Sequence, residues 1–256
     1  MIRIAVVGAA GRMGRAVESA AAAAGVTIAA RIERAGNPGT PAGVWTGDLA
    51  DVVEPGMVVI EFTGPEGARR AAEVCAAKGA ALVSGATGLT AEDEAVVRSA
   101  SAKVAVVRAS NFSLGIAALR AALRAAAASL PASWDVEIVE RHHRLKKDSP
   151  SGTALTLADD LLAARGETRS SLRHGREGVA GPREPGELGM HAVRGGTWVG
   201  DHQVLFAGEG EWLELRHVAQ DRSAFAHGAV AAARFAGAAA AGWYTLDDVL
   251  RGPGRA

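Results

Sequence analysis

The first part of the chain alternates short apolar runs with segments in which apolar residues recur at helical spacing. The apolar runs are rich in Val, Ile and Ala and predict buried strands at 2–7, 26–32, 57–62, 81–84 and 104–108. The segments between them predict helices at 12–24, 65–79 and 90–100. Strands and helices that alternate in this way are typical of a parallel sheet with right-handed crossover connections.

After Asn111 the pattern becomes mixed. Helices are predicted at 115–130 and 153–165. Apolar and polar residues alternate over 134–140 and predict a half-buried strand, and further strands and turns are expected over 193–215. This second pattern indicates an α+β region with a different kind of sheet.

Two other segments of the second part have a distinctive composition. Residues 173–189 are rich in Gly, Arg and Glu and are expected to form a long loop. Ser223 is expected to cap an Ala-rich helix that runs to Ala241 and is ended by Gly242. We expect this last helix to return to the first part of the fold.

The composition limits the classes of function that the chain can have. The chain has 256 residues, 48% of them hydrophobic, and 28 basic residues balance 28 acidic ones. A formal net charge of zero gives no global field, so we expect no nucleic-acid partner and no membrane partner. No stretch reaches the roughly 18 uncharged apolar residues of a spanning helix. The N-terminus has the pattern of a strand rather than of a secretory segment, so we expect a cytoplasmic protein.

The chain has one cysteine, Cys75. A disulfide framework and a Cys-based zinc site are therefore excluded, and a buried structural thiol is the expected role. His142 and His143 are adjacent, so they point to opposite sides of an extended chain and do not readily share one metal ion. We expect no metal site.

A glycine-rich loop separates the first predicted strand from the first predicted helix. It has the spacing GxxGxxG and consists of Gly8, Ala9, Ala10, Gly11, Arg12, Met13 and Gly14. Small residues at this place let the backbone approach a pyrophosphate, whose charge meets free N–H groups at the start of the helix. A glycine triplet alone also fits a tight turn without a ligand, but the flanking strand and helix favour a dinucleotide site.

An acidic residue follows the second predicted strand. Glu33 comes 19 residues after Gly14 and is placed to accept hydrogen bonds from the adenosine ribose. The next residue, Arg34, can pair with the 2′-phosphate of NADP, although an ordinary solvated arginine also fits this position. The two residues together predict that NADH, NADPH or both bind.

These observations define a fold class, α/β. We expect an N-terminal Rossmann-type domain with a parallel sheet and a smaller α+β domain with a mixed or antiparallel sheet. Residues 1–112 and 223–256 are expected to form the dinucleotide-binding domain. Residues 113–222 are expected to bind substrate and to form the oligomer.

A basic cluster follows the strand predicted at 134–140. Residues 141–147 read Arg-His-His-Arg-Leu-Lys-Lys, with six basic side chains in seven positions. A solvated charged face and a nucleic-acid patch are the ordinary interpretations of such a run. Here the run leads into Ser151, Gly152 and Thr153 at the start of a predicted helix, where free N–H groups bind anions. We therefore expect a small substrate with more than one carboxylate. A histidine and a lysine in this place are also suited to proton transfer.

Residues 140–153 resemble the E-x-H-H-R-x-K-x-D-x-P-S-G-T pattern of the dihydrodipicolinate reductase family, also called 4-hydroxy-tetrahydrodipicolinate reductases. The resemblance extends over nearly the whole chain. It includes Gly8 to Gly14, Phe62–Thr63 with Pro65 to Gly67, Gly85 to Gly88, Asn111 to Ser113 with Gly115, Gly200 to His202, and Phe225–Ala226 with Gly228–Ala229.

The resemblance implies roles for individual residues. His142 and Lys146 match the catalytic pair of the family, and His143, Gly152 and Thr153 match its contacts to substrate carboxylates. The matching cofactor contacts are Gly8, Ala9, Ala10, Gly11, Arg12, Met13, Glu33, Arg34, Gly85, Ala86, Thr87, Ala109, Ser110, Asn111 and Phe112. Two positions depart from the family: Ala86 stands where many members carry Thr, and Gly64 where some carry Arg.

The resemblance also implies an activity: the reduction by NADH or NADPH of a cyclic dicarboxylate on the diaminopimelate route to lysine. The nicotinamide is expected in the cleft between the domains, with hydride attacking C4 of the ring. His142 and Lys146 supply or relay the proton, and Lys146 is also implied in loss of the substrate hydroxyl. A homotetramer built through the sheet of the second domain is implied as well.

Three other functions are consistent with parts of the sequence. A related Rossmann-type amino-acid or sugar dehydrogenase would share the glycine loop but not the His, Lys and Ser-Gly-Thr series. A catalytically silent NAD-binding protein would lack a competent acid. An RNA-binding role for the basic run would show affinity that falls steeply with salt.

Overall fold

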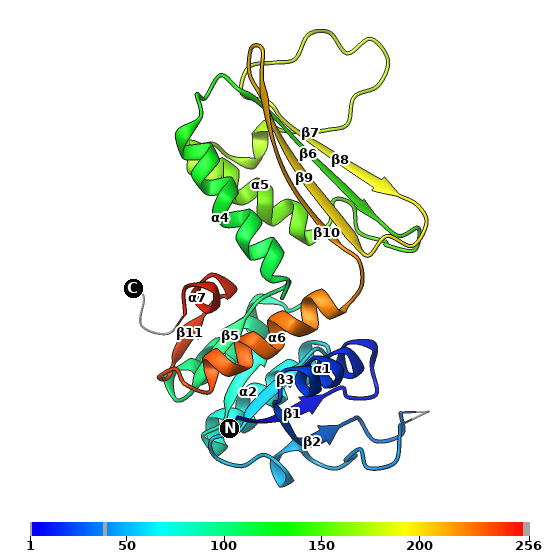
Figure 1. Ribbon diagram of the computed structural model, residues 1–256, viewed down its shortest axis with the longest axis vertical. Coiled ribbons are helices and arrows are strands. Elements are labelled where there is room, and N and C mark those ends of the chain that lie inside the picture. The colour runs from blue at the N-terminus through cyan, green and yellow to red at the C-terminus, as the bar shows by residue number, and fades with distance from the viewer. Residues whose placement is uncertain (1, 38–39, 253–256) are drawn as a thin grey trace. The chain divides into compact units, whose positions relative to one another are not determined.

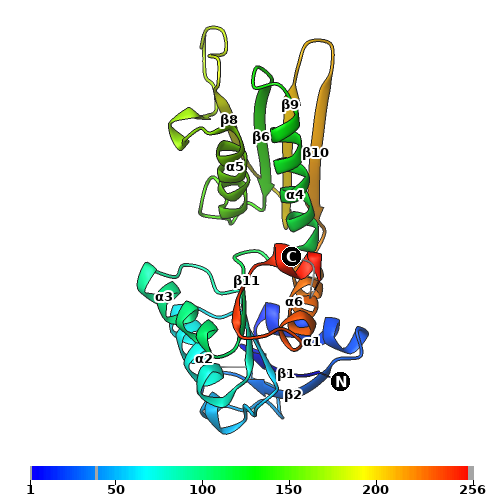
Figure 2. The same cartoon turned by 90° about the vertical axis from the view of Figure 1, so that its left-hand side faces the viewer.

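The computed structural model of the protein describes residues 2–37 and 40–252. Within these residues the chain forms two compact units, which Figure 1 and Figure 2 show from two sides. The first unit contains the residues up to Leu114 and those from Arg222 onward, and the second is Gly115–Asp221. Each unit has its own sheet and its own apolar interior.

The first unit is built on a six-stranded sheet in which every pairing is parallel. Its strand order is β11-β5-β4-β3-β1-β2. The strands are β1 (Arg3–Val7), β2 (Thr27–Ile32), β3 (Val58–Glu61), β4 (Ala81–Ser84), β5 (Ala105–Arg108) and β11 (Gly242–Tyr244). From β1 the chain turns first to β2 on one side and then to β3 on the other. In such sheets ligands bind beyond the carboxyl ends of the strands where the order reverses.

Helices cover both faces of this sheet. They are α1 (Arg12–Ala23), α2 (Pro65–Lys78), α3 (Ala91–Ser99), α6 (Ser223–Ala236) and α7 (Leu246–Arg251), with short 3-10 helices at Leu49–Asp51 and Ala100–Ala102. Helix α1 packs on α6, and α2 packs on α3. The buried positions of α2 are mostly alanine, such as Ala68, Ala71 and Ala72, so the helix lies close to the strands. None of the helices in the described residues is long and apolar enough to span a membrane.

The second unit has a five-stranded mixed sheet with the order β10-β9-β6-β8-β7. Strand β9 runs antiparallel to β6 and β10, while β6, β8 and β7 are parallel. The strands are β6 (Asp135–His142), β7 (Leu172–His174), β8 (Leu188–Arg194), β9 (Gly200–Ala207) and β10 (Trp212–Ala219). Helices α4 (Leu114–Ser129) and α5 (Gly152–Arg165) lie on one face of this sheet, and a 3-10 helix follows at Arg169–Ser171 (Figure 1). Alternate residues of the strands fill the interior between the sheet and these helices.

The two sheets confirm the predicted fold class, and most predicted elements lie within two residues of the observed ones. The loop predicted at 173–189 was wrong at both ends, because Leu172–His174 forms β7 and β8 begins at Leu188. A strand of three residues is too short to show a period, and β7 exists because it pairs with β8.

The end of the last helix was also wrong. The N-cap position of α6 is Arg222 and not Ser223, and the helix ends at Ala236 rather than Ala241. Gly242 is the first residue of β11, which pairs with β5. Alanine favours a helix locally, but a parallel strand at 242–244 requires a turn before it, so sheet pairing outweighs helix propensity here.

Candidate active site

The glycine loop joins the end of β1 to the start of α1. The N–H groups of Gly8 and Ala9 donate to the carbonyl oxygen of Ile32, at 2.9 and 3.1 Å, so the loop is fixed to the end of β2. Gly8 has φ +76°, and a Cβ on Gly14 would lie 2.3 Å from the carbonyl oxygen of Gly8. Gly11, at the N-cap position of α1, offers no side-chain acceptor to the first N–H groups of the helix. In this geometry the N–H groups at the start of a helix can bind a pyrophosphate.

Glu33 lies between the glycine loop and Arg34. Its Oε2 accepts a hydrogen bond from the N–H of Ala10 at 3.1 Å, and its Oε1 accepts one from the N–H of Arg34 at 2.9 Å. A cavity of about 730 Å³ begins beside these residues. It is lined by Val7, Gly8, Ile32, Glu33, Arg34, Gly47, Asp48, Leu49, Thr63, Gly64, Pro65, Glu66, Gly67 and Arg70. The structure thus brings Gly8, Glu33 and Arg34 to one cavity of the first unit.

The other expected cofactor residues follow β4 and β5. Gly85, Ala86 and Thr87 come directly after β4, and Ala109 to Phe112 come directly after β5. None of them lines the cavity described above. Because the strands are parallel, both segments lie at the same edge of the sheet as the glycine loop. Ala86 is buried, with 1% of its surface exposed, so the position that departs from the family is enclosed by protein.

Packing of aromatic side chains fixes these two segments. The rings of Phe62 and Phe112 meet edge to face with their centroids 5.4 Å apart. A Cβ on Gly85 would lie 2.1 Å from the ring of Phe62, so glycine is required for this approach.

Glu61, at the end of β3, was not predicted as a site residue. It is completely buried, and its Oε2 accepts hydrogen bonds from the N–H and the hydroxyl of Thr63 at 3.0 and 2.8 Å. Its Oε1 accepts one from the hydroxyl of Ser84. The carboxylate therefore ties the turn after β3 to the end of β4. An acidic residue that closes an otherwise apolar strand was the sequence signal for it.

In the second unit, His142 is the last residue of β6 and is buried, with 7% of its surface exposed. Its Nδ1 hydrogen-bonds to Oε2 of Glu140 at 2.5 Å. Arg194 of β8 donates to both oxygens of Glu140, at 2.7 and 2.8 Å. Burial raises the pKa of Glu140, but the hydrogen bonds from His142 and Arg194 outweigh it and lower the pKa to about 2. Glu140 is therefore ionised at neutral pH.

The start of α5 is attached to the same carboxylate. The N–H of Ser151 donates to Oε1 of Glu140 at 3.0 Å, and Oγ of Ser151 caps the helix by accepting from the N–H of Ala154 at 3.2 Å. The hydroxyl of Ser151 also hydrogen-bonds to Nε2 of His202 at 3.2 Å. The proton donor expected at His142 and the anion site expected at the start of α5 are thus part of one network.

His202, from β9, was quoted in the sequence resemblance without a role. Its ring packs edge to face against that of His142, with centroids 5.1 Å apart. Burial and the neighbouring His142 lower the pKa of His202 to about 4, so this ring is neutral at neutral pH. In the sequence, the adjacent polar residues Asp201 and His202 in a predicted strand region were the feature that pointed to this site. Both are buried in the structure.

The remaining expected site residues lie in the turn after β6 and at the start of α5. Lys146 Nζ forms an ion pair with Asp148 at 2.8 Å, and the N–H of Lys146 donates to the carbonyl of His143. Nδ1 of His143 is buried and has no hydrogen-bond partner among the described residues. Gly152 and Thr153 form the first positions of α5. In the described part of the chain no hydrogen bond or ion pair joins His142 to Lys146.

The basic cluster is divided by the geometry of β6. The side chain of Arg141 pairs with Asp201 at 3.1 Å and with Gln203, on the face of the sheet opposite to His142. Arg141 therefore has a structural role. No group of three His, Cys, Asp or Glu residues in the described ranges is arranged to hold a metal ion.

Comparison with known proteins extends to both units. The family model for the N-terminus of dihydrodipicolinate reductase matches residues 2–112, and the model for the C-terminus of the same enzyme matches residues 115–250. A protein from Anaeromyxobacter sp. (strain Fw109-5) named 4-hydroxy-tetrahydrodipicolinate reductase is 44% identical, with 98% of each chain covered. A protein of the same name from Caulobacter vibrioides is also 44% identical, with 97% of each chain covered.

Two solved structures are similar to this chain over nearly its whole length. Dipicolinate-bound dihydrodipicolinate reductase from Paenisporosarcina sp. TG-14 has a TM-score of 0.77 and 26% identity, with 96% of this chain and 97% of that chain covered. An amine dehydrogenase from Mycobacterium smegmatis has a TM-score of 0.61 at 17% identity, over 100% of this chain and 97% of that chain, which is a likeness of fold alone. Both family models together cover nearly all of the described residues, so this chain belongs to the dihydrodipicolinate reductase family.

Proposed function

We propose that this chain is an NAD(P)H-dependent reductase that converts 4-hydroxy-tetrahydrodipicolinate to tetrahydrodipicolinate in the biosynthesis of diaminopimelate and lysine. Relatives with 44% identity over nearly the whole chain carry the name of this activity. The observation that supports it within the chain is the buried Glu140–His142 pair, which is hydrogen-bonded to the start of α5. The reduction of a dicarboxylate requires a proton donor beside an anion site, and this arrangement supports that assignment.

The residues of the first unit fit a nicotinamide dinucleotide. The close approach of Gly14 to Gly8 leaves no room for a side chain at the helix start, and the cavity carries Glu33 for the ribose and Arg34 for a 2′-phosphate. When bound, the reduced nicotinamide supplies a hydride. We assign the pyrophosphate to the loop Gly8 to Met13. We assign the nicotinamide end to Gly85, Ala86, Thr87, Ala109, Ser110, Asn111 and Phe112.

The second unit is assigned the substrate. The N–H groups at the start of α5, at Gly152 and Thr153, donate to one carboxylate, because the N-terminus of a helix attracts anions. His143, whose buried Nδ1 lacks a partner among the described residues, binds the second carboxylate. A flat ring with two carboxylates then lies next to His142.

We assign proton transfer to the substrate to His142 and Lys146. The hydride adds at C4 of the conjugated imine, and the negative charge that develops in the ring is neutralised by a proton from His142, with Lys146 relaying or assisting. Asp148 holds the Lys146 ammonium at 2.8 Å, and Lys146 hydrogen-bonding lowers the pKa of Asp148. We also assign to Lys146 the assistance of the departure of the substrate hydroxyl. Holding substrate and donor in one place removes an entropic part of the barrier.

The direct test is an assay of the purified protein with freshly synthesised 4-hydroxy-tetrahydrodipicolinate. We expect substrate-dependent oxidation of both NADH and NADPH. The decrease in absorbance of the reduced nicotinamide measures it. Dipicolinate should inhibit competitively with substrate, because its two carboxylates would take the same anion sites. The absence of oxidation with either cofactor would contradict the proposed function.

We also propose a homotetramer that acts in the cytoplasm. The face of the second sheet that α4 and α5 leave uncovered carries Val193, Trp212 and Val218, with exposures of 38%, 73% and 50%. Apolar side chains on an open sheet face are typical of a subunit interface. Sedimentation velocity should give four times the mass of the chain, and Val218→Lys should lower it. A monomeric wild-type protein would exclude the assembly.

A further inference from the structure

The carboxylate of Glu140 connects three segments of the second unit. It is completely buried and accepts hydrogen bonds from His142 on its own strand, from Arg194 on β8 and from the N–H of Ser151 before α5. A buried carboxylate with this many donors is fully paired, so its position is fixed. The ring of His142 is therefore fixed as well, since Glu140 holds its Nδ1 at 2.5 Å.

Among the described residues, four hydrogen bonds reach Glu140, and three of them come from groups that can only donate. Two are from Arg194, whose guanidinium has no acceptor, and one is from the backbone N–H of Ser151. His142 is the single partner whose nitrogen can either donate or accept. Because the ionised Glu140 can only accept, a neutral His142 must carry its proton on Nδ1.

This leaves Nε2 of His142 as the nitrogen that exchanges protons. Gly200, on β9, lies beside it: a Cβ on Gly200 would lie 3.3 Å from Nε2. A side chain at this position would therefore crowd Nε2. On another side the ring packs against His202, with an angle of 73° between the ring planes. The ring therefore has one nitrogen held by Glu140 and the other beside Gly200.

We propose that Glu140 is a positioning residue that keeps a proton on Nδ1 of His142, so that the doubly protonated ring delivers its Nε2 proton to the substrate and becomes the neutral Nδ1–H form, and that Gly200 keeps the approach to Nε2 open. Arg194 supports this role by keeping Glu140 ionised and by fixing both of its oxygens. The role rests on the proposed function, in which His142 is the proton donor.

The first test needs no variant of Glu140. Nitrogen-15 NMR of the wild-type protein, labelled at histidine, reports which ring nitrogen carries the proton. The His142 signals are assigned as those missing from His142→Gln. We expect the Nδ1–H form when the ring is neutral. A predominant Nε2–H form would overturn the proposal.

The second test is Glu140→Gln. The new amide has one acceptor and one donor end, and His142 is the single partner that can accept from the donor end. We therefore expect the amide to donate to Nδ1, so that the proton of neutral His142 moves to Nε2 and the doubly protonated ring that delivers the proton is disfavoured. Turnover should fall by about 10²–10⁴-fold, the range for a disabled general acid. The KM for substrate should change far less, since the start of α5 keeps its N–H groups.

A matched control is Asp160→Asn. Asp160 is a mostly buried carboxylate of the same unit that pairs with Arg120 and Arg124, and no hydrogen bond or ion pair joins it to His142 in the described residues. This variant loses the same charge but should keep the wild-type tautomer and turnover. A folded Glu140→Gln with the wild-type tautomer and kcat would overturn the proposal.

Gly200→Ala tests the other end of the ring. The added methyl group would crowd Nε2 but leave the bond to Glu140 intact. We expect the Nδ1–H form to persist while kcat/KM falls at least about tenfold, and an unchanged kcat/KM would remove the role of Gly200. The tautomer is measured without substrate. An Nε2–H tautomer would therefore overturn the role of Glu140 whatever the activity. A wild-type protein without reductase activity would overturn the proposed function alone.

Discussion

Two arginines line the cavity of the first unit, and their surroundings differ. Arg70 donates to both oxygens of Asp48, at 2.8 and 2.6 Å, so its charge is matched. No hydrogen bond or ion pair holds the guanidinium of Arg34 in the described residues, although its N–H bonds to Glu33. Of the two, Arg34 is therefore the one whose charge is available for a cofactor phosphate.

Arg34→Ala should weaken the binding of NADPH much more than the binding of NADH, because only NADPH carries the 2′-phosphate. The loss of one charge-assisted contact predicts a Kd for NADPH that rises about 10- to 100-fold. Calorimetric titration of each cofactor measures this. Arg3→Ala, which breaks an exposed pair with Glu54, is the control. Equal losses for both cofactors would remove the role of Arg34.

His202 makes the stability of the second unit depend on pH. Its pKa in the folded protein is lowered to about 4 from 6.5, first by burial and then by His142. Between these two values the unfolded chain binds a proton that the folded chain does not. The free energy of unfolding therefore falls as the pH decreases from about 6.5 to about 4.

Between pH 7 and pH 5, His202 should account for about 2 kcal/mol of lost stability. Urea unfolding at both pH values measures the loss in wild type and in His202→Gln, which cannot titrate. The variant should lose about 2 kcal/mol less than wild type. His174→Gln, at an exposed histidine, should behave as wild type. An identical pH dependence in His202→Gln would contradict the burial argument.

At this scale the sequence was informative about which residue types occur and less so about their partners. His142 and the start of α5 followed from a local motif. Glu140 belongs to the same motif, but its partner Arg194 is 54 residues away, so the bond between them could not be foreseen. No hydrogen bond or ion pair joins His142 to Lys146 in the described residues, because Lys146 lies in the turn after β6 and pairs with Asp148.

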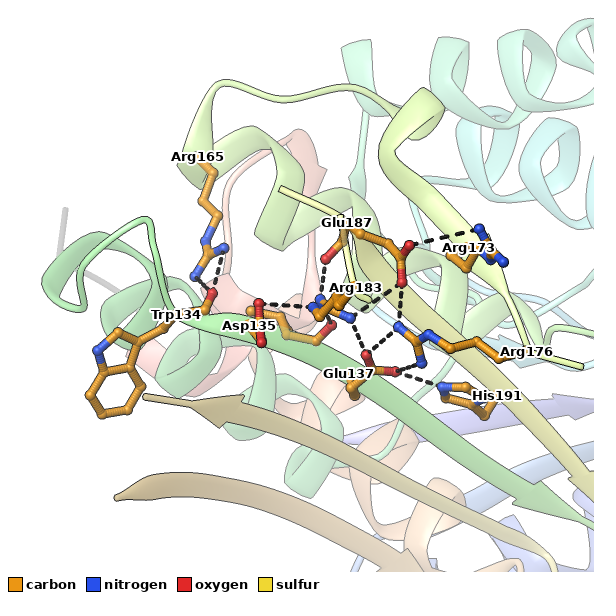
Figure 3. A network of polar contacts seen from close by, with 10 residues as sticks. Trp134, Asp135, Glu137, Arg165, Arg173, Arg176, Arg183, Glu187 and His191 are labelled. Carbon is orange, nitrogen blue, oxygen red and sulfur yellow. Dashed lines mark hydrogen bonds and ion pairs between the residues drawn. The ribbon is translucent and has the colours of Figure 1, made fainter. Parts of the chain in front are cut away.

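At the scale of elements, the irregular segment 175–187 between β7 and β8 is held by ion pairs. Figure 3 shows Arg176 and Arg183 converging on Glu137 of β6 and on Glu187. Arg176 lies 2.8 Å from Glu137, and His191 of β8 reaches the same carboxylate at 2.6 Å. Several mostly buried charges in one network fix a loop more firmly than isolated surface pairs do.

Arg183→Gln should therefore loosen this segment. The unpaired carboxylates should lower the free energy of unfolding by about 1–3 kcal/mol and speed hydrogen exchange within 175–187. Exchange followed by mass spectrometry measures the effect. Arg169→Gln, which breaks an exposed pair with Asp159, should leave the exchange unchanged. Unchanged exchange in the Arg183 variant would mean that the network does not hold the loop.

The elements show why the sequence was a good guide to some segments and not to others. The strands β1 to β5 of the first unit are mostly apolar runs, so their bounds were close. Strand β7, strand β11 and helix α7 are short, and their positions depend on pairing or packing with distant residues. The segment at 173–189 was expected to be a loop because of its Gly, Arg and Glu. Its inner part is irregular, but the anchoring by Glu137 is not a local property.

At the scale of the whole molecule, the two units carry the residues of different proposed tasks. The first unit carries the glycine loop and the cavity with Glu33 and Arg34. The second carries His142, Lys146 and the start of α5. If this division holds, variants of the second unit should lose turnover and keep cofactor binding. The fold class could be predicted from the alternation of strands and helices along the chain. The division of tasks between the units could be predicted only from the glycine-loop and 140–153 motifs.

The measurement that tests this most directly is steady-state kinetics of His142→Gln and Lys146→Ala, together with their affinity for NADH. Turnover should fall by about 10²–10⁴-fold in each, because each removes a group from proton transfer. The Kd for NADH should stay within about twofold of wild type, a change of less than about 0.5 kcal/mol. His174→Gln and Lys103→Ala change the same residue types at exposed positions and should keep wild-type turnover. Wild-type turnover in both folded site variants would contradict the account.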